Sequence, residues 1–570
     1  MNEKQRLQKQ LTPESMVYLA ILLLAVLLRF VHLGRPAMND HEAGLALQAL
    51  KWAAGESPLL SGEPGYLSLT AALFFVFRST EFLARFWPAL AGSLVVLLPL
   101  FIRESFGKLT ALILAFLLAI DPILIAGSRS AEGSMLALLG LLAGLGFWFK
   151  KRAVLSGFCL GVAFLGGPGV WFGVLALVIV LMIFRRSSKQ GFSEAQLWQP
   201  SGKELLLVVA AAMTTLTVTS TLFFTYPRGL SAIGASFAEF PSSWQSADGM
   251  TVSGVLIAWS LTLLPLILIA GISVIDGFIR GDKRVKWLAV WALVALLLVV
   301  ANPSRQLNDL FWVSFSLLLL GAIKIAAIFS NWKVDNSIVT IAEAGLTVSL
   351  VVFSFFNGLY LLNNLQMAND EYRNRIIGMI LPLILLVGLT VLLAWGWSEI
   401  STRKGLAAGV VILSFFMVFA GAWKATGLTN PPGFEFSRGA GTPITENEFM
   451  STLHDLSRSK TGIENRIDIL QAGLTMPSVE WLLRDFENLS SAAAINPKES
   501  HSVVLTPADV ILQTDISYRG QKFRWAIAPL PEEMNFTDWM KWWVFRTAPV
   551  EETNIILWAR NDLFPGGATP

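Results

Sequence analysis

The chain has 570 residues, of which 54% are hydrophobic and 15% are charged, and its formal net charge is +3. Soluble proteins carry about 25% charged residues, so this composition excludes an ordinary soluble protein and indicates a polytopic membrane protein. The single cysteine, Cys159, excludes an internal disulfide and argues against a cysteine-based metal site. We therefore expect membrane lipids around the chain, and no nucleic-acid partner.

The first fifteen residues form a polar tail, and an apolar segment at 16–33 follows it. This segment is too long for the core of a signal peptide and has no small-residue cleavage site after it, so it is predicted to be a retained span. Further apolar segments recur up to residue 424 and predict about thirteen spans. The predicted spans are 16–33, 84–102, 108–126, 132–149, 153–166, 169–184, 204–224, 252–275, 285–301, 308–329, 338–362, 376–397 and 405–424.

Two apolar segments do not fit a simple span. The segments 153–166 and 169–184 are separated only by glycines and a proline, so they are either two short spans or one broken span. Segment 66–78 is too short to cross comfortably, and we expect a surface-lying or re-entrant helix within the first external loop, 34–83.

The basic residues predict the orientation of the chain. With the spans above, Lys and Arg concentrate in one set of short loops, which includes Lys150-Lys151-Arg152 and the run 280–286. Because basic residues stay on the cytoplasmic side, the tail 1–15 is predicted to be cytoplasmic and loop 34–83 external. The protein is then expected to lie in the plasma (inner) membrane with an extracytoplasmic C-terminus.

Beyond residue 424 the composition changes. Residues 425–570 contain proline-rich turns, short alternating stretches at 502–506, 511–520 and 554–560, and amphipathic stretches at 477–489 and 537–546. They predict a soluble α/β domain, outside the membrane and large enough to have its own core. The predicted fold class is an α-helical polytopic membrane protein with this domain at its C-terminus.

The first external loop begins with an unusual acidic stretch. Asn39 and Glu42 have the spacing of a helix capping box, so the acidic residues could simply begin a helix at the membrane surface. Asp40 and Glu42 could also serve as general bases, because a helix start fixes them at the membrane boundary, beneath a soluble domain. The two interpretations are compatible.

Further motifs follow in order along the chain. The loop continues with Glu63-Pro64-Gly65-Tyr66, and the second span opens with the run 85–92, RFWPALAG. Asp121-Pro122 and the run 128–132, SRSAE, come next. In the C-terminal domain the runs are WLLRD at 481–485 and WWVFR at 542–546.

In their order and spacing these motifs resemble the GT-C glycosyltransferases. The branch with protein O-mannosyltransferases and lipid A aminoarabinose transferases is the most similar, and the C-terminal runs resemble a flippase-associated prokaryotic subfamily. The resemblance is good over 16–185 and holds only in outline beyond it. Two positions depart from the family pattern: His41 separates Asp40 from Glu42, and Glu132 replaces an aspartate.

The resemblance implies an inverting transfer of a sugar from a polyprenyl-phosphate donor to an extracytoplasmic acceptor, which could be a hydroxyl of a glycan, a lipid or a protein. Asp40 is the first choice for the general base and Glu42 the second. Cations must stabilise the departing lipid phosphate, and arginine binds phosphate with two parallel hydrogen bonds. The residues expected to bind substrate or phosphate are Glu63, Arg85, Arg129, Glu132, Arg228 and Arg305. Headgroup contacts or loop ion pairs are the plain alternative for each arginine.

Several questions stay open in the sequence. A divalent cation bound by His41 and Glu63 is one open alternative for a cofactor. The spacing of these two residues is not diagnostic of a metal site. A lipid-linked glycan flippase or transport component, and a non-catalytic accessory protein of glycosylation, are the alternative functions. Within the spans, Lys324 is expected to pair with a group on another helix, and Arg29 to extend outward to the headgroups.

Overall fold

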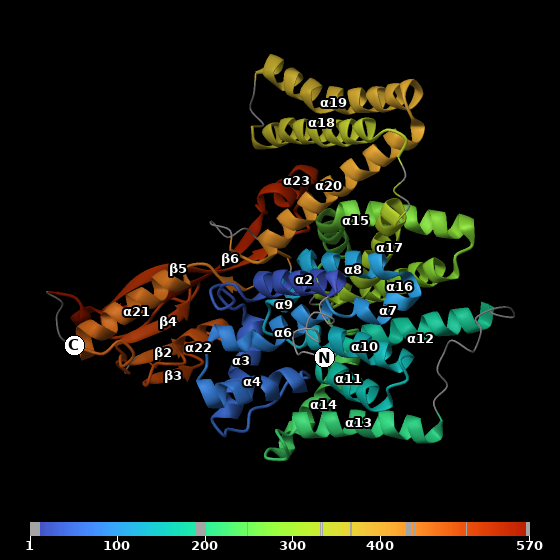
Figure 1. The fold of residues 1–570 in the computed structure, drawn as a ribbon. Coiled ribbons are helices and arrows are strands. Elements are labelled where there is room, and N and C mark those ends of the chain that lie inside the picture. The colour runs from blue at the N-terminus through green and yellow to red at the C-terminus, as the bar shows by residue number, and fades with distance from the viewer. Residues whose placement is uncertain are drawn as a thin grey trace, which may run out of the picture.

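The computed structural model describes residues 12–187, 201–247, 249–330, 332, 334–364, 368–428, 435–436, 441–496 and 499–565. Its first three quarters form a large helical domain (Figure 1). The helices up to the first long break are α2 (Pro13–Phe30), α3 (Asp40–Ala53), α4 (Pro64–Phe77), α5 (Glu81–Ala84), α6 (Phe86–Val95), α7 (Pro99–Phe106), α8 (Lys108–Ile120), α9 (Pro122–Ser128), α10 (Ser134–Phe149), α11 (Ala153–Leu165) and α12 (Val170–Ser187). The later ones are α13 (Gly202–Ser220), η2 (Pro227–Gly229), α14 (Leu230–Ser242), α15 (Val252–Arg280), α16 (Lys283–Ala301), η3 (Leu307–Leu310), α17 (Phe311–Ser330), α18 (Ser337–Asn363), α19 (Asn369–Gly396) and α20 (Glu399–Ala425).

Within the described residues, nine helices or continuous helix pairs are long and apolar enough to cross a membrane, and each coincides with a predicted span. A tenth predicted span, 108–126, is the pair α8 and α9, which bends by 56°. The other three are the shorter apolar helices α10, α11 and α12. The polytopic helical fold is confirmed. The count of thirteen, however, depends on these three short helices, because length alone supports nine or ten spans.

The bend between α8 and α9 has a local cause. Asp121 is extended and caps α9 by accepting a hydrogen bond from Leu124 N at 2.8 Å, and Pro122 occupies the first helical position. The freed carbonyls at the end of α8 are satisfied by Arg29, which donates to Leu118 O and Ala119 O at 3.1 Å each. Arg29 is fully buried, so the expectation that it extends to the headgroups is wrong.

The helices α11 and α12 are two separate short helices rather than one broken span. Gly167, between them, has a φ of +91°, which reverses the chain. Helix α11 packs closely because small residues line its contacts: Gly140 of α10 faces the backbone of Ala163, and Gly157 faces the backbone of Val208 on α13. Small residues allow membrane helices to approach in this way.

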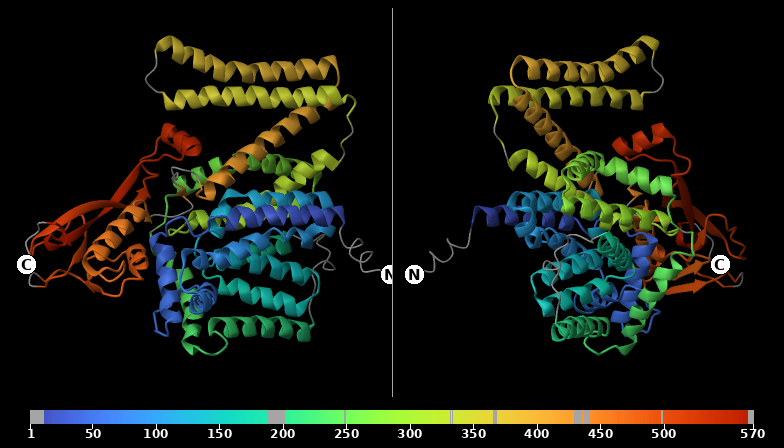
Figure 2. Two further views of the ribbon diagram at one scale, coloured as in Figure 1. Left: turned by 60° about the vertical axis from the view of Figure 1, so that its left-hand side comes forward. Right: turned by 90° about the vertical axis from the view of Figure 1, so that its right-hand side faces the viewer.

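Helices α18 and α19 form a hairpin that stands apart from the other helices and joins them through the oblique helix α20 (Figures 1 and 2). Much of the hairpin is exposed and apolar, for example Leu392 and Phe356, as expected of a surface in lipid. Elsewhere the intramembrane residue Lys324 pairs with Asp276 of α15, which confirms the expected partner on another span.

The C-terminal domain contains one mixed six-stranded sheet in the order β1-β5-β6-β4-β2-β3. Strands β2, β3 and β4 are parallel, and the others are antiparallel. Its elements are β1 (Thr442–Pro443), α21 (Glu446–Thr461), β2 (Ile469–Ala472), α22 (Pro477–Leu483), β3 (Leu489–Ala492), β4 (Val503–Pro507), β5 (Tyr518–Pro529), α23 (Phe536–Phe545), β6 (Val550–Arg560) and η5 (Asn561–Leu563). The predicted α/β class is correct. The stretch 511–517, expected to be part of a strand, is irregular, and β5 begins only at Tyr518.

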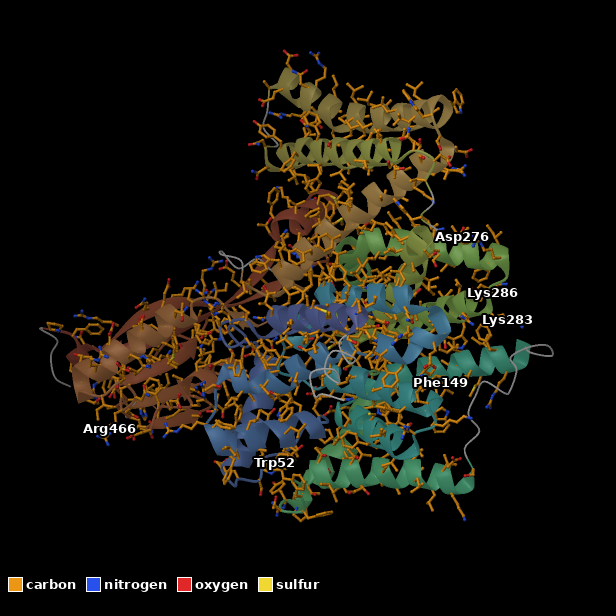
Figure 3. The ribbon with its side chains drawn as sticks, viewed as in Figure 1. Trp52, Phe149, Asp276, Lys283, Lys286 and Arg466 are labelled. Carbon is orange, nitrogen blue, oxygen red and sulfur yellow. The ribbon has the colours of Figure 1, made fainter. Side chains whose placement is uncertain are left out.

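Two helices attach this domain to the membrane domain. Helix α22 packs on α3, and α23 contacts α15 and α18, where Trp543 packs on Phe355. The basic residues Lys283 and Lys286 lie at the opposite end of the helices from the C-terminal domain, which carries Arg466 (Figure 3). The C-terminal domain therefore covers the end of the membrane domain that lies away from these lysines and that carries α3 of loop 34–83.

Candidate active site

Helix α3 begins with the predicted capping box. The Asn39 side chain accepts a hydrogen bond from Glu42 N at 2.8 Å, and Glu42 Oε2 accepts one from Asn39 N at 3.4 Å. This reciprocal pair fixes the first turn of the helix. It turns the Glu42 side chain into the protein, where that side chain is buried.

Glu42 forms a buried ion pair with Arg85. Arg85 Nε donates to Glu42 Oε1 at 3.0 Å, and Nη2 donates to Oε2 at 2.8 Å. The remaining Arg85 donors bind the carbonyls of Leu33, Pro36 and Ala37, and only 2% of Arg85 is exposed. Burial alone would raise the pKa of Glu42, but the guanidinium and the hydrogen bonds hold it below its ordinary value.

Arg129 binds backbone carbonyls at the C-terminal end of α2, the first span. Its Nη1 donates to Arg29 O at 2.9 Å and to Val31 O at 3.0 Å, and Nη2 donates to His32 O at 3.3 Å. These carbonyls lie in the last turn of α2 and just after it, where a cation is favoured by the helix dipole. Arg129 therefore holds α2 against the loop that follows α9.

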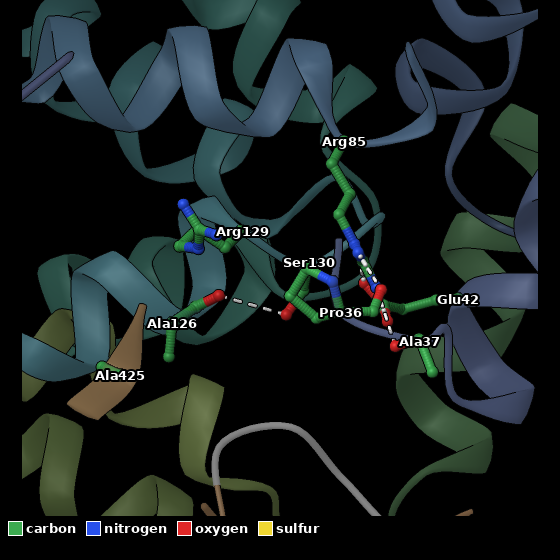
Figure 4. Close-up of a pocket in the computed structure, with 8 residues that line it drawn as sticks. All are labelled: Pro36, Ala37, Glu42, Arg85, Ala126, Arg129, Ser130 and Ala425. Carbon is green, nitrogen blue, oxygen red and sulfur yellow. Dashed lines mark hydrogen bonds and ion pairs between the residues drawn. The ribbon is translucent and has the colours of Figure 1, made fainter. Parts of the chain in front are cut away.

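Glu42, Arg85 and Arg129 line one pocket together with Pro36, Ala37, Ala126, Ser130 and Ala425 (Figure 4). Figure 4 shows the Arg85 guanidinium directed at the Glu42 carboxylate and Arg129 across the pocket from it. The cavity has a volume of about 20 Å³, close to the space that one water needs. The pocket in this conformation cannot hold a sugar.

Three further acidic residues lie beside this pocket: Glu63 and Glu132 meet at the loop between α9 and α10, and Glu239 binds the residue before Glu63. Glu63 Oε2 accepts a hydrogen bond from Gly133 N at 2.8 Å, and Glu239 of α14 accepts one from Gly62 N at 2.7 Å. Glu132 Oε1 accepts from Ser134 Oγ at 3.0 Å and from Asn308 Nδ2 at 2.6 Å. We call Glu63, Glu132 and Glu239 the acidic cluster. Ala131 N donates to Glu42 Oε1 at 2.7 Å, so one short loop links the cluster to the Arg85–Glu42 pair.

Burial and mutual repulsion dominate the electrostatics of the acidic cluster. Burial raises the pKa of Glu132 to about 7, and the charge of Glu42 acts in the same direction. Burial, together with the charges of Glu132 and Glu239, raises the pKa of Glu63 well above its ordinary value. No member of the cluster has a Lys or Arg partner within the described residues. Glu132 can therefore exchange a proton close to neutral pH, which suits general acid–base chemistry.

Asp40 points away from both groups. Its Oδ1 accepts a hydrogen bond from Ser478 N at 3.0 Å, at the start of α22. Its Oδ2 faces Gly441, which precedes β1. Asp40 is only half-buried and contributes to the attachment of the C-terminal domain. His41, the next residue, is exposed.

Arg228 and Arg305 lie in other loops. Arg228 is exposed in η2, and its side chain has no ion-pair partner in the part of the chain that the structure describes. Arg305 Nη1 donates to Met250 O at 2.8 Å, while its buried Nε has no hydrogen-bond partner there. Arg305 is three residues from Asn308, which contacts Glu132. Of the four predicted arginines, these two keep donors for a ligand.

The described residues contain no group of three or more His, Cys, Asp and Glu side chains that could hold a metal ion. In particular, the structure does not complete a ligand set around His41 and Glu63. Sequence reasoning missed Glu239 and Asn308. Asn308 could have been noticed, because it lies in the same short loop as Arg305; Glu239 is a lone acid on an amphipathic helix and carries no local signal.

No protein-family model matches the sequence. No curated protein matches it either. Solved structures do match. ArnT from Cupriavidus metallidurans bound to undecaprenyl phosphate has a TM-score of 0.54 and 13% identity, over 98% of this chain and 100% of that one. ArnT in the apo state gives a TM-score of 0.53 with 13% identity, over 97% and 98% of the two chains. The chain has a GT-C fold.

An oligosaccharyltransferase from Archaeoglobus fulgidus is also similar, with a TM-score of 0.46 and 13% identity over 84% of this chain and 63% of that one. The match with ArnT covers almost all of both chains, so the GT-C fold extends through the C-terminal domain. At this identity the similarity establishes the fold, and the chemistry has to be argued from the residues of the site.

Proposed function

We propose that the protein is a membrane glycosyltransferase that moves a sugar from a polyprenyl phosphate to an extracytoplasmic hydroxyl. The observation that carries the proposal is the placement of the acidic cluster. The buried carboxyl groups of Glu63 and Glu132 lie beside the pocket that Arg85 and Arg129 line. This pocket is at the end of a GT-C membrane domain that a soluble domain covers. ArnT, which has this fold, binds undecaprenyl phosphate.

The orientation that the basic loops predict completes the proposal. With Lys283 and Lys286 in the cytoplasm, the C-terminal domain at the opposite end of the helices faces the extracytoplasmic side. The acidic cluster is linked to α3, on which that domain packs, and faces the same side. The donor lipid would reach the site from the outer leaflet of the inner membrane.

The reaction needs a base and a phosphate-binding cation. A carboxylate takes the proton of the acceptor hydroxyl, and the oxygen then displaces the lipid phosphate from the anomeric carbon with inversion. Arg305 is the first choice for the phosphate, because its Nε is unpartnered and lies in the loop that contacts Glu132; Arg228 is the second. Arg85 and Arg129 hold the loops in place, because their donors already bind carbonyls and Glu42.

One observation favours an accessory role instead. Both acids of the first-loop motif are committed to other contacts, Glu42 to Arg85 and Asp40 to Ser478. A protein that had lost the chemistry and kept the fold could bind a lipid-linked glycan without transferring it.

Transfer from synthetic polyprenyl-phosphate sugars distinguishes these functions. Purified protein in nanodiscs is given a panel of radiolabelled donors and a membrane extract as the acceptor, and labelled products are measured. We expect transfer from at least one donor. Arg305→Ala should raise the KM for that donor about tenfold or more, whereas Arg373→Ala, which removes an exposed arginine on α19, should leave it unchanged. Absence of transfer from every donor, with movement of lipid-linked glycan between leaflets, would instead establish a transport component.

A further inference from the structure

The loop between α9 and α10 contains Glu132, a carboxyl group separate from the two that the sequence motif favours as the base. We propose that Glu132 takes the proton from the acceptor hydroxyl, and that Asn308 is the positioning residue that holds Glu132 for this step. The inference rests on the proposed function and names the base within it.

The two acids of the first loop are poor candidates because of their contacts. Glu42 accepts four hydrogen bonds, two from Arg85 and one each from Ala131 N and Asn39 N. Taking up a proton would break the ion pair and strand a buried guanidinium. Asp40 is directed at the C-terminal domain. Its Oδ1 accepts a hydrogen bond from Ser478 N, and its Oδ2 lies next to Gly441. Neither carboxylate offers a hydroxyl an open oxygen inside the site.

Glu132 has the opposite arrangement. Both of its hydrogen bonds, from Ser134 Oγ and Asn308 Nδ2, reach Oε1, and Oε2 accepts none from the described residues. Only 7% of the residue is exposed, so the side chain is held in one direction with one oxygen free. A base needs this combination of fixed position and open lone pairs.

The surroundings of Glu132 tune its basicity. The groups that face it are Glu42 from α3, Glu63 from the segment before α4, and Asp309 beside Asn308 on η3. Arg305 lies in the same loop as Asn308. Burial raises the pKa of Glu132 to about 7, so the group is partly ionised at neutral pH and still basic enough to accept a proton.

The step balances in protons and electrons. The hydroxyl proton moves to Glu132 Oε2 as the hydroxyl oxygen forms a bond to the anomeric carbon. The bond from that carbon to the phosphate oxygen breaks, and its electron pair leaves with the polyprenyl phosphate. Glu132 then returns the proton to water, and the products are the glycosylated acceptor and the lipid phosphate.

The test compares Glu132→Gln, Glu132→Asp and Asp40→Asn, with Glu56→Gln as a matched control on an exposed acid of the first loop. We expect Glu132→Gln to lower kcat by about 10²-fold or more, with the donor KM within about threefold of the parent. Glu132→Asp should recover part of the loss because it keeps the carboxylate. The assignment would be overturned if Glu132→Gln kept full activity. It would also be overturned if Asp40→Asn lowered kcat as much as Glu132→Gln does.

The positioning role of Asn308 has its own readout. In the parent, kcat/KM should rise with pH through about 7 as the base ionises. Asn308→Ala removes the hydrogen bond that favours the carboxylate, so this limb should move to higher pH; Asn308→Asp should move it further. An unchanged limb in both variants would refute the role of Asn308. If the parent transfers no sugar, the proposed function fails, whereas an active parent with an active Glu132→Gln variant removes only the choice of base.

Discussion

The Arg85–Glu42 pair and the acidic cluster are neighbours, joined through residues 131–133. They nevertheless shift the pKa of a buried glutamate in opposite directions. Glu42 and Glu132 are both buried glutamates. The pKa of Glu42 is held down by a bidentate guanidinium, whereas burial raises the pKa of Glu132, which lacks one. The partner, rather than the depth of burial, decides which carboxylate maintains the structure and which can exchange protons.

Breaking the Arg85–Glu42 pair should give the largest effect. Arg85→Ala leaves Glu42 buried and uncompensated and frees three carbonyls, so we expect a loss of about 3–5 kcal/mol in the free energy of unfolding. The midpoint of chemical unfolding in detergent measures it. The double variant Arg85→Ala/Glu42→Gln should be more stable than the single variant, because it removes the stranded charge. Equal stability of the two would show that the pair carries little of the energy.

Glu132 and Glu63 should make the protein less stable as pH rises. A carboxyl whose pKa is higher in the folded state favours folding fully below its unfolded pKa, and this contribution is lost as pH rises through the folded pKa. For Glu132 the window runs from about 4.5 to about 7 and corresponds to roughly 3 kcal/mol. Glu63 acts in the same direction.

Unfolding midpoints of the parent and of Glu132→Gln across this range test the prediction. The midpoint of the parent should fall with increasing pH, and the curve of the variant should be flatter because one titrating group is gone. Parallel curves would mean that Glu132 has the same pKa in both states.

The sequence predicted the helical fold well, because apolar length is a strong local signal and each predicted span has a counterpart. Of the predicted site residues, Glu42, Arg85 and Arg129 line one pocket, and Glu63 and Glu132 lie beside it. The sequence could not assign roles among them. The role of Glu42 depends on its ion pair with Arg85, 43 residues away in the chain. The role of Glu132 depends on its hydrogen bond from Asn308, 176 residues away.

The same limit explains Asp40 and Arg29. Asp40 is the first choice for the base from the sequence, although it fits the motif only after a one-residue shift; in the structure its partner is Ser478 in another domain. Arg29 near the end of an apolar helix suggested a headgroup contact, but the bend between α8 and α9 provides buried carbonyls that no local pattern reveals.

Asp40 should therefore matter more for docking than for chemistry. Asp40→Ala removes a hydrogen bond between a carboxylate and a backbone N–H, worth about 1.5 kcal/mol, or about tenfold in the docking equilibrium. Engineered cysteines report docking. A Cβ at Gly44 would lie 3.7 Å from Pro477 Cβ, a disulfide distance, so Gly44→Cys/Pro477→Cys should cross-link on mild oxidation. Adding Asp40→Ala should slow that cross-link several-fold; an unchanged rate would contradict a docking role.

The smallest effect is expected at Lys51, which also contacts α22. Lys51 Nζ lies 2.8 Å from Glu480 Oε1, but the two side chains are 42% and 43% exposed. Water and salt screen such a pair, and ordering two long side chains costs entropy, so Lys51→Ala should change stability by less than about 1 kcal/mol. The cross-linking rate should also stay within about twofold of the parent, and high salt should abolish any difference. If Lys51→Ala instead weakened docking as much as Asp40→Ala, long-range charge attraction would hold the two domains together, and the directed hydrogen bond to Ser478 would be incidental.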